Sequence, residues 1–146
     1  MKIMAVDYGD ARTGIALCDP WELLASPLCV VFEKNPEKLL EKVAALAKEY
    51  GAGRVVVGLP KNMNGTLGPR AQLCHEFAEK LEKASGLETV LWDERNTTVA
   101  ATQILNTTDT RGKKRKNVID AVAATLILEG YLAYRKQTRE GEDNGN

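Results

Sequence analysis

Residues 3–18, IMAVDYGDARTGIALC, contain two short runs of strand-forming residues, 3–8 and 15–18, joined by a glycine-bounded turn over residues 9–14. A third run of the same kind, LCVVFE, follows at residues 28–33. Short turns between successive strands are typical of an antiparallel meander. The sequence therefore predicts that the chain begins with three strands linked by hairpin-like turns.

After this meander the apolar residues alternate between helical and extended spacing. Helices are expected over about residues 36–50, 69–85, 96–106 and 117–135, and further strands over 54–57 and 88–92. The order βββαβαβαα predicts an α/β fold, with a mixed five-stranded sheet flanked by helices. Residues 1–136 are expected to form a single domain, and the polar residues 137–146 a disordered tail.

The composition excludes several classes of protein. With 44% hydrophobic and 27% charged residues among 146, the chain is neither disordered nor too small for a core. The formal net charge of zero does not by itself point to nucleic acid. No apolar run approaches the roughly 18 residues of a membrane span, and the N-terminus does not resemble a signal peptide. Three cysteines without a CxxC pair suit a reducing cytoplasm.

Acidic residues stand at positions where carboxylates are unusual. Asp7 lies within or at the end of the first apolar strand, where burial of its charge needs compensation. Asp93 and Glu94 follow the strand at 88–92, at the end where open α/β sheets bind ligands. Asp120 falls in the first turn of the last helix.

Each acid also has a structural interpretation when taken alone. Asp7 could bond to the turn at Gly9 or Thr13, and Asp93 with Glu94 could be a solvated pair. Asp120 completes a capping-box-like sequence. Taken together, carboxylates are the hard oxygen ligands that Mg²⁺ and Mn²⁺ require. Two such ions can support in-line cleavage of a phosphodiester.

At these positions the sequence resembles the YqgF family, also called the Holliday junction resolvase-like or RuvX family. Four motifs carry the resemblance, in the family's order, over residues 1–134. They are D-Y-G-x-x-R-x-G-x-A-x-x-D at residues 7–19, G-L-P-x-x-x-x-G at 58–65 with Gly68-Pro69-Arg70-Ala71, D-E-R-x-T-T at 93–98, and I-D-x-x-A-A at 119–124.

The resemblance implies a ribonuclease H-like fold and a cytoplasmic nuclease that processes the 5′ end of pre-16S ribosomal RNA. Resolution of branched DNA is a second implied activity. It further implies a catalytic and metal-binding site formed by Asp7, Glu94 and Asp120, holding Mg²⁺ or Mn²⁺, with two ions expected. Asp93 is a neighbouring candidate, because the sequence does not show which acid of the pair faces inward.

Basic residues near these acids are candidates for nucleic-acid binding. Lys113, Lys114, Arg115 and Lys116 precede Asp120, where they could attract a phosphate backbone or form a solvated loop. The other candidates are single arginines, each with an alternative role. Arg12 and Arg70 could bind phosphate or pair with Asp10 or Asp19, and Arg95 could pair with Glu94.

Two other functions stay open at this stage. Asp7-x-Gly9 with Thr13 faintly resembles the phosphate loop of actin-like phosphotransferases, although those close two domains around ATP. The chain could also be a binding protein that has lost activity. A resolvase acting on a two-fold junction would suggest a homodimer. Trp21 and Trp92 are expected to be packing residues.

Overall fold

The computed structural model describes residues 1–60, 68–93 and 112–144, with side chains for residues 1–60, 68–93 and 122–138. The strands are β1 (Lys2–Asp7), β2 (Arg12–Cys18), β3 (Ala25–Phe32), β4 (Ala52–Leu59) and β5 (Glu88–Asp93). The helices are α1 (Pro36–Glu49), α2 (Pro69–Ser85) and α4 (Gly112–Asn144). The expected helix at 96–106 lies outside the described residues.

The strands form one sheet in the order β3-β2-β1-β4-β5. β1 pairs antiparallel with β2, and β2 antiparallel with β3, as the meander predicted. β4 is parallel to β1, and β5 is parallel to β4, because a helix connects each of these later strands. The predicted mixed five-stranded sheet is confirmed.

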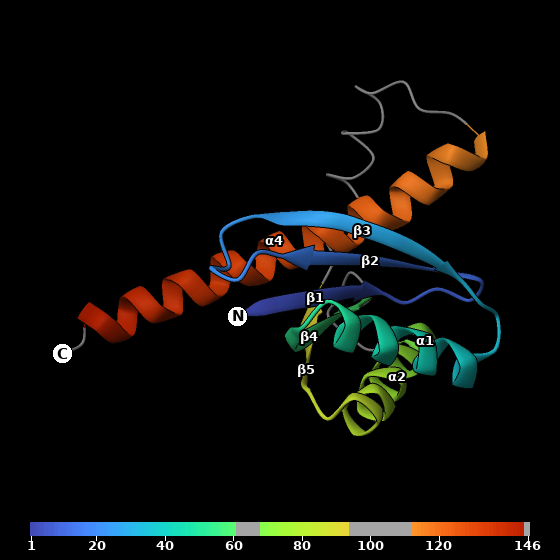
Figure 1. Cartoon of the computed structure of the whole chain (residues 1–146), viewed down its shortest axis with the longest axis horizontal. Coiled ribbons are helices and arrows are strands. Elements are labelled where there is room, and N and C mark those ends of the chain that lie inside the picture. Colours follow the sequence, from blue (N-terminus) through green and yellow to red (C-terminus); the bar gives the residue numbers. More distant parts are fainter. Residues whose placement is uncertain (61–67, 94–111, 145–146) are drawn as a thin grey trace.

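Helices cover both faces of this sheet, with α1 and α2 on one side and α4 on the other (Figure 1). The side chains of β1 alternate between the two layers. Met4 and Val6 belong to the core under α1 and α2. Ile3 and Ala5 belong to the core under α4. All four residues are fully buried, so β1 is central to both cores.

Local sequence signals set the ends of α1 and α2. The Asn35 side chain accepts bonds from the Glu37 and Lys38 N–H groups and so caps α1. Pro69 begins α2, where its missing N–H costs nothing. Gly86 ends α2 with φ at 72°, a left-handed conformation that suits glycine. Both helices match the sequence prediction closely.

The last helix differs from its predicted limits of 117–135. It begins at Gly112, so the basic run at 113–116 is helical rather than a loop. It ends at Asn144, so the helix continues into the segment from residue 137 onward that was expected to form the tail. Lys, Arg, Gln and Glu are good helix formers, and they extend a helix whose middle is already held by packing. No helix within the described ranges is long and apolar enough to cross a membrane.

Candidate functional site

The parallel strands bring their carboxyl ends, and two of the candidate acids, to one edge of the sheet. Asp7 is the last residue of β1, and Asp93 is the last residue of β5. Between them runs β4, in which Val57 aligns with Val6 and Leu59 aligns with Asp93. With strands spaced by about 4.8 Å, β1 and β5 are separated by roughly 10 Å at this edge.

Alternation along the strands puts the two acids on different faces of the sheet. Asp7 follows Ile3 and Ala5 in the series that faces α4. In β5 the residues packed on the α4 side are Val90 and Trp92, so Asp93 falls in the opposite series. The structure therefore brings Asp7 and Asp93 to the same edge but does not place them on one surface.

The turn after Asp7 is tightly built. A Cβ added at Gly9 would lie 1.9 Å from the Arg12 carbonyl oxygen, so only glycine fits there. The Gly9 N–H donates to the Oγ1 of Thr13, which is fully buried, at 3.3 Å. Opposite Asp7 in the β1–β2 pair is Gly14, which adds no side chain to the α4-facing surface beside this carboxylate.

Arg70, at the start of α2, holds the same turn from the other layer. Its Nη1 donates to Asp10 Oδ1 at 2.6 Å, and its Nη2 donates to the Tyr8 carbonyl oxygen. The guanidinium lies 4.9 Å from the centre of the Tyr8 ring, which also stacks on Phe77 at 4.5 Å. Arg70 therefore pairs with Asp10, and phosphate binding by this residue stays a prediction.

Asp19, the last residue of the first motif, has a structural role that the sequence did not reveal. Its carboxylate accepts the backbone N–H groups of Trp21, Leu23 and Leu24 at 3.0, 2.8 and 2.6 Å. The bond from Leu24 is the main cause that lowers the pKa of Asp19 below its usual value. Asp19 therefore organises the turn between β2 and β3.

Trp21 departs from the prediction that it is a packing residue, because 74% of it is exposed. It stands in the turn between β2 and β3, where its backbone N–H donates to Asp19. Trp92 does pack, edge to face against Tyr131 with ring centres 5.9 Å apart. Glu22 and Arg135 form a pair at 2.6 Å that the sequence did not predict, because 113 residues separate them.

The remaining candidates fall partly outside the described residues. Arg12 is half-buried at the start of β2, aligned with Phe32. Glu94 and Arg95 are not described. The backbone at 113–116 and at Asp120 is helical within α4, but these side chains are not described. Among the described side chains, no group of three acids, histidines or cysteines could hold a metal ion.

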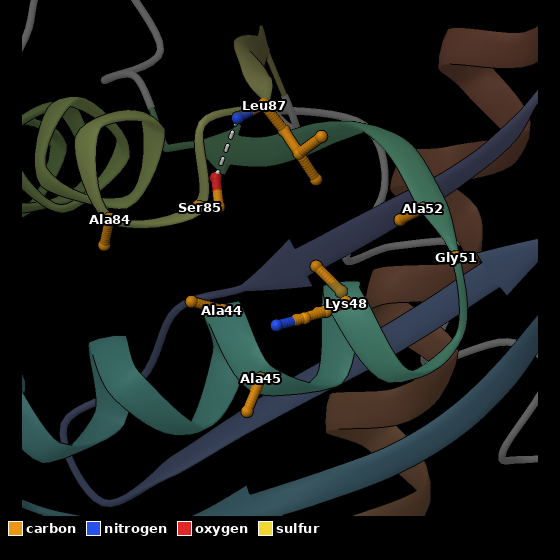
Figure 2. Close-up of a pocket in the computed structure, with 9 residues that line it drawn as sticks. Ala44, Ala45, Lys48, Gly51, Ala52, Ala84, Ser85 and Leu87 are labelled. Atoms are coloured by element: carbon orange, nitrogen blue, oxygen red, sulfur yellow. Dashed lines mark hydrogen bonds between the residues drawn. The ribbon is translucent and has the colours of Figure 1, made fainter.

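A pocket of about 480 Å³ lies at the other edge of the sheet. Figure 2 shows Ala44 and Lys48 of α1 on one side of it, and Ser85 and Leu87 on the other. The pocket adjoins Ala52, at the start of β4, and Lys48 is its one ionisable residue. Open α/β sheets bind ligands at the carboxyl ends of their strands, so this pocket is not the candidate site.

Comparison with known proteins points to one family. The family model "RuvX: Holliday junction resolvase" matches residues 1–134. A Halothermothrix orenii protein named "Putative pre-16S rRNA nuclease" is 44% identical over 137 residues, which cover 94% of this chain and 98% of that protein. A protein of the same name from Carboxydothermus hydrogenoformans is also 44% identical, with 94% and 99% covered.

Solved structures with the same architecture include two resolvases. RuvC from T. thermophilus, in complex with a Holliday junction substrate, aligns with a TM-score of 0.62 at 15% identity, over 94% of this chain and 97% of that chain. The fowlpox virus Holliday junction resolvase aligns with a TM-score of 0.56 at 14% identity, over 92% and 99%. At such identities the likeness concerns the fold, and it confirms the expected ribonuclease H-like architecture.

Proposed function

This chain belongs to the RuvX family, and from that premise we propose that it is a metal-dependent nuclease that cleaves phosphodiester bonds in structured nucleic acid. Its proposed substrate is pre-16S ribosomal RNA, since the relatives that match nearly its whole length are named for a nuclease of that RNA. Cleavage at the 5′ end and action in the cytoplasm are part of the proposal and follow from the motif resemblance alone. The observation that carries the proposal is the position of Asp7, at the carboxyl end of the central strand and on the face covered by α4.

The packing of α4 supports a role for Asp120 beside Asp7. The Glu22 carboxylate binds both Arg135, at 2.6 Å, and the N-terminal ammonium of Met1, at 3.3 Å. Residue 135 of α4 therefore lies near the start of β1. From there α4 runs back obliquely across the sheet, behind β2 and β3, toward the side on which β1 ends (Figure 1). From residue 135 to residue 120 the helix advances about 22 Å, and from Met1 to Asp7 the strand advances about 20 Å.

These two lengths agree, which supports a position for residue 120 near the level of Asp7. Helical spacing supports the same assignment. Ala124 and Ile127 are fully buried against the sheet, and residue 120 precedes them by four and seven positions, on the same stripe of α4.

Strand alternation favours Glu94 over Asp93 as the partner of Asp7. Asp93 falls in the series opposite to the α4 face, and one further step of the same alternation would return to that face. Glu94 is outside the described residues, so its role is part of the proposal. Asp93 would then lie next to the metal site without binding the metal.

The chemistry of this donor set fits a hard divalent cation. Asp7, Glu94 and Asp120 would hold Mg²⁺ or Mn²⁺, with two ions expected, and Gly14, which aligns with Asp7, adds no side chain of its own beside this carboxylate. Bound cations of this kind generate hydroxide from water and stabilise the oxygen that leaves. The residues of the basic run 113–116 precede Asp120 by one to two helical turns and would attract the phosphate backbone.

Resolution of a four-way DNA junction is the second candidate, because the family model that matches the chain describes a Holliday junction resolvase. A four-way junction with two-fold symmetry would be bound by two copies of the chain. The two candidates share the acidic site and differ in substrate. Precursor 16S RNA and a four-way junction should therefore be offered side by side, each with Mg²⁺ and with Mn²⁺.

The decisive variant is Asp7→Asn, with its folding checked by urea denaturation. Removing a direct metal ligand should reduce cleavage more than removing a residue that only hydrogen-bonds to a ligand. The rate of cleavage by Asp7→Asn should therefore fall more than about 100-fold. Glu94→Gln should behave in the same way, whereas Asp93→Asn should keep most of its activity. Unchanged cleavage by a folded Asp7→Asn protein would refute the proposal.

A further inference from the structure

In the turn between β2 and β3, the apolar side chains are exposed and the carboxylate of Glu22 is buried. Trp21, Leu23 and Leu24 are 74%, 80% and 66% exposed. Glu22, the charged residue among them, has a side chain that is only 6% exposed. Large apolar side chains in water and a buried carboxylate are the informative exceptions to ordinary burial. We call the residues Trp21, Leu23 and Leu24 the apolar turn.

The apolar turn is held in a fixed shape. Asp19 accepts three of its backbone N–H groups. Glu22 has φ at 59°, a left-handed conformation that costs free energy in a residue other than glycine. Arg135 and the N-terminal ammonium hold its carboxylate inward. A contact surface that is already ordered loses less entropy on binding than a mobile one.

A groove of about 390 Å³ lies beside the apolar turn. Leu23 and Leu24 line one side of it, and Leu132 and Ala133 of α4 line the other. An exposed tryptophan and an apolar groove therefore occupy one face of the molecule. A two-fold interface requires such a self-complementary patch, since each copy must supply both a projection and the recess that receives it.

The charges on α4 are also self-complementary. Glu129 and Lys136 line the groove, are exposed, and make no ion pair within the described part of the chain. They are seven residues apart on one helix face, about 10.5 Å along the axis, with the small Ala133 between them. If two α4 helices crossed antiparallel at Ala133, each Glu129 would oppose the Lys136 of the other copy.

We propose that this face is a homodimer interface, in which the Trp21 side chain of each copy enters the groove of the other and Glu129 pairs with Lys136 twice. The face is remote from the acidic edge. The N-terminal ammonium donates to the Pro20 carbonyl oxygen at 2.8 Å, so the apolar turn lies at the start of β1, whereas Asp7 ends that strand. The interface therefore leaves the acidic edge open, and it does not depend on the proposed nuclease activity.

Sedimentation analysis of the full chain tests the interface. The wild-type chain should sediment as a dimer of the 16.0 kDa protomer. Trp21→Glu should weaken dimerisation about thirtyfold or more, as expected for a central tryptophan. Phe32→Glu is the matched control, since Phe32 is 53% exposed at the far end of β3 and should leave the dimer intact.

Charge exchange tests the antiparallel arrangement separately. In the Glu129→Lys variant, a lysine of each copy would face Lys136 of the other copy, so the dimer should be weaker. The double exchange Glu129→Lys/Lys136→Glu places opposite charges across the interface again and should restore the dimer. A wild-type chain that is monomeric at about 0.1 mM would overturn the proposal and assign this face to another partner. A dimer that survives Trp21→Glu, or a double exchange as weak as the single one, would also overturn it.

Discussion

Arg70 reaches from the start of α2 to Asp10, with Nη1 and Oδ1 2.6 Å apart, and so joins the α2 layer to the turn that follows Asp7. Its second nitrogen donates to the carbonyl oxygen of Tyr8, the residue next to Asp7. Arg70, a candidate for phosphate binding, therefore contacts the backbone of the residue that immediately follows the candidate acid. The Arg70 side chain is 36% exposed and that of Asp10 is 89% exposed, and ion pairs this exposed add little to the free energy of unfolding. The contact is therefore expected to orient the turn more than to stabilise the fold.

Arg70→Ala is expected to lower kcat about tenfold with little change in KM, because it releases the turn that orients Asp7. Asp10→Asn should have a similar but smaller effect, and the double variant should be less than additive. The salt dependence of binding separates this role from phosphate contact. Loss of a phosphate contact would reduce the slope of log K against log salt by about one. A reduced slope with unchanged kcat would contradict a positioning role.

Gly9→Ala is expected to destabilise the protein and to abolish cleavage, because the new methyl group would lie 1.9 Å from the backbone oxygen of Arg12. The Arg12 backbone cannot move away from the new methyl group without opening the β1–β2 turn. The free energy of unfolding should therefore fall by about 2 kcal/mol or more. Gly53→Ala is the control. Its Cβ would meet the flexible Met1 side chain, with Sδ at 3.1 Å, and should be tolerated. Equal urea midpoints for the two variants would contradict the prediction.

Much of the fold was predictable from local pattern. Short hairpin turns fixed the antiparallel half of the sheet, and the fully apolar run at 54–57 marked β4 as a strand with both faces covered. Caps and breakers at Asn35, Pro69 and Gly86 marked the ends of α1 and α2. The same pattern placed Asp7 within or at the end of the first strand, whereas the central position of that strand in the sheet came only from the structure.

The features that sequence analysis missed depend on contacts between distant segments. Glu22 and Arg135 have no spacing that relates them, so their pairing emerges only when α4 packs beside the β2–β3 turn. The exposure of Trp21 was missed because hydrophobic character alone does not show whether a partner surface is present. The limits of α4 were missed because its two terminal segments are polar and charged, and so lack the apolar spacing on which the helix prediction relied.

The Glu22–Arg135 pair predicts a defined dependence of stability on pH. Burial would raise the pKa of Glu22, but the hydrogen bonds from Arg135 and the N-terminal ammonium outweigh burial and lower the pKa below its usual value of 4.5. A carboxylate with a lowered pKa in the folded state adds stability that is complete above its unfolded pKa. That contribution is lost as the pH falls from about 4.5 through the folded pKa.

Glu22→Gln should therefore lower the free energy of unfolding at neutral pH by about 2 kcal/mol, between the values for exposed and buried pairs, since the two side chains are 6% and 20% exposed. The difference from the wild-type chain should shrink as the solution is acidified below pH 4.5, because the wild-type carboxylate then takes up a proton. Urea denaturation at neutral and acidic pH measures both values. Glu33→Gln, which removes a pair with the half-exposed Lys42, should cost less than about 1 kcal/mol at neutral pH. A constant difference between wild type and Glu22→Gln at every pH would show that the side chain acts by packing and that its charge is not used.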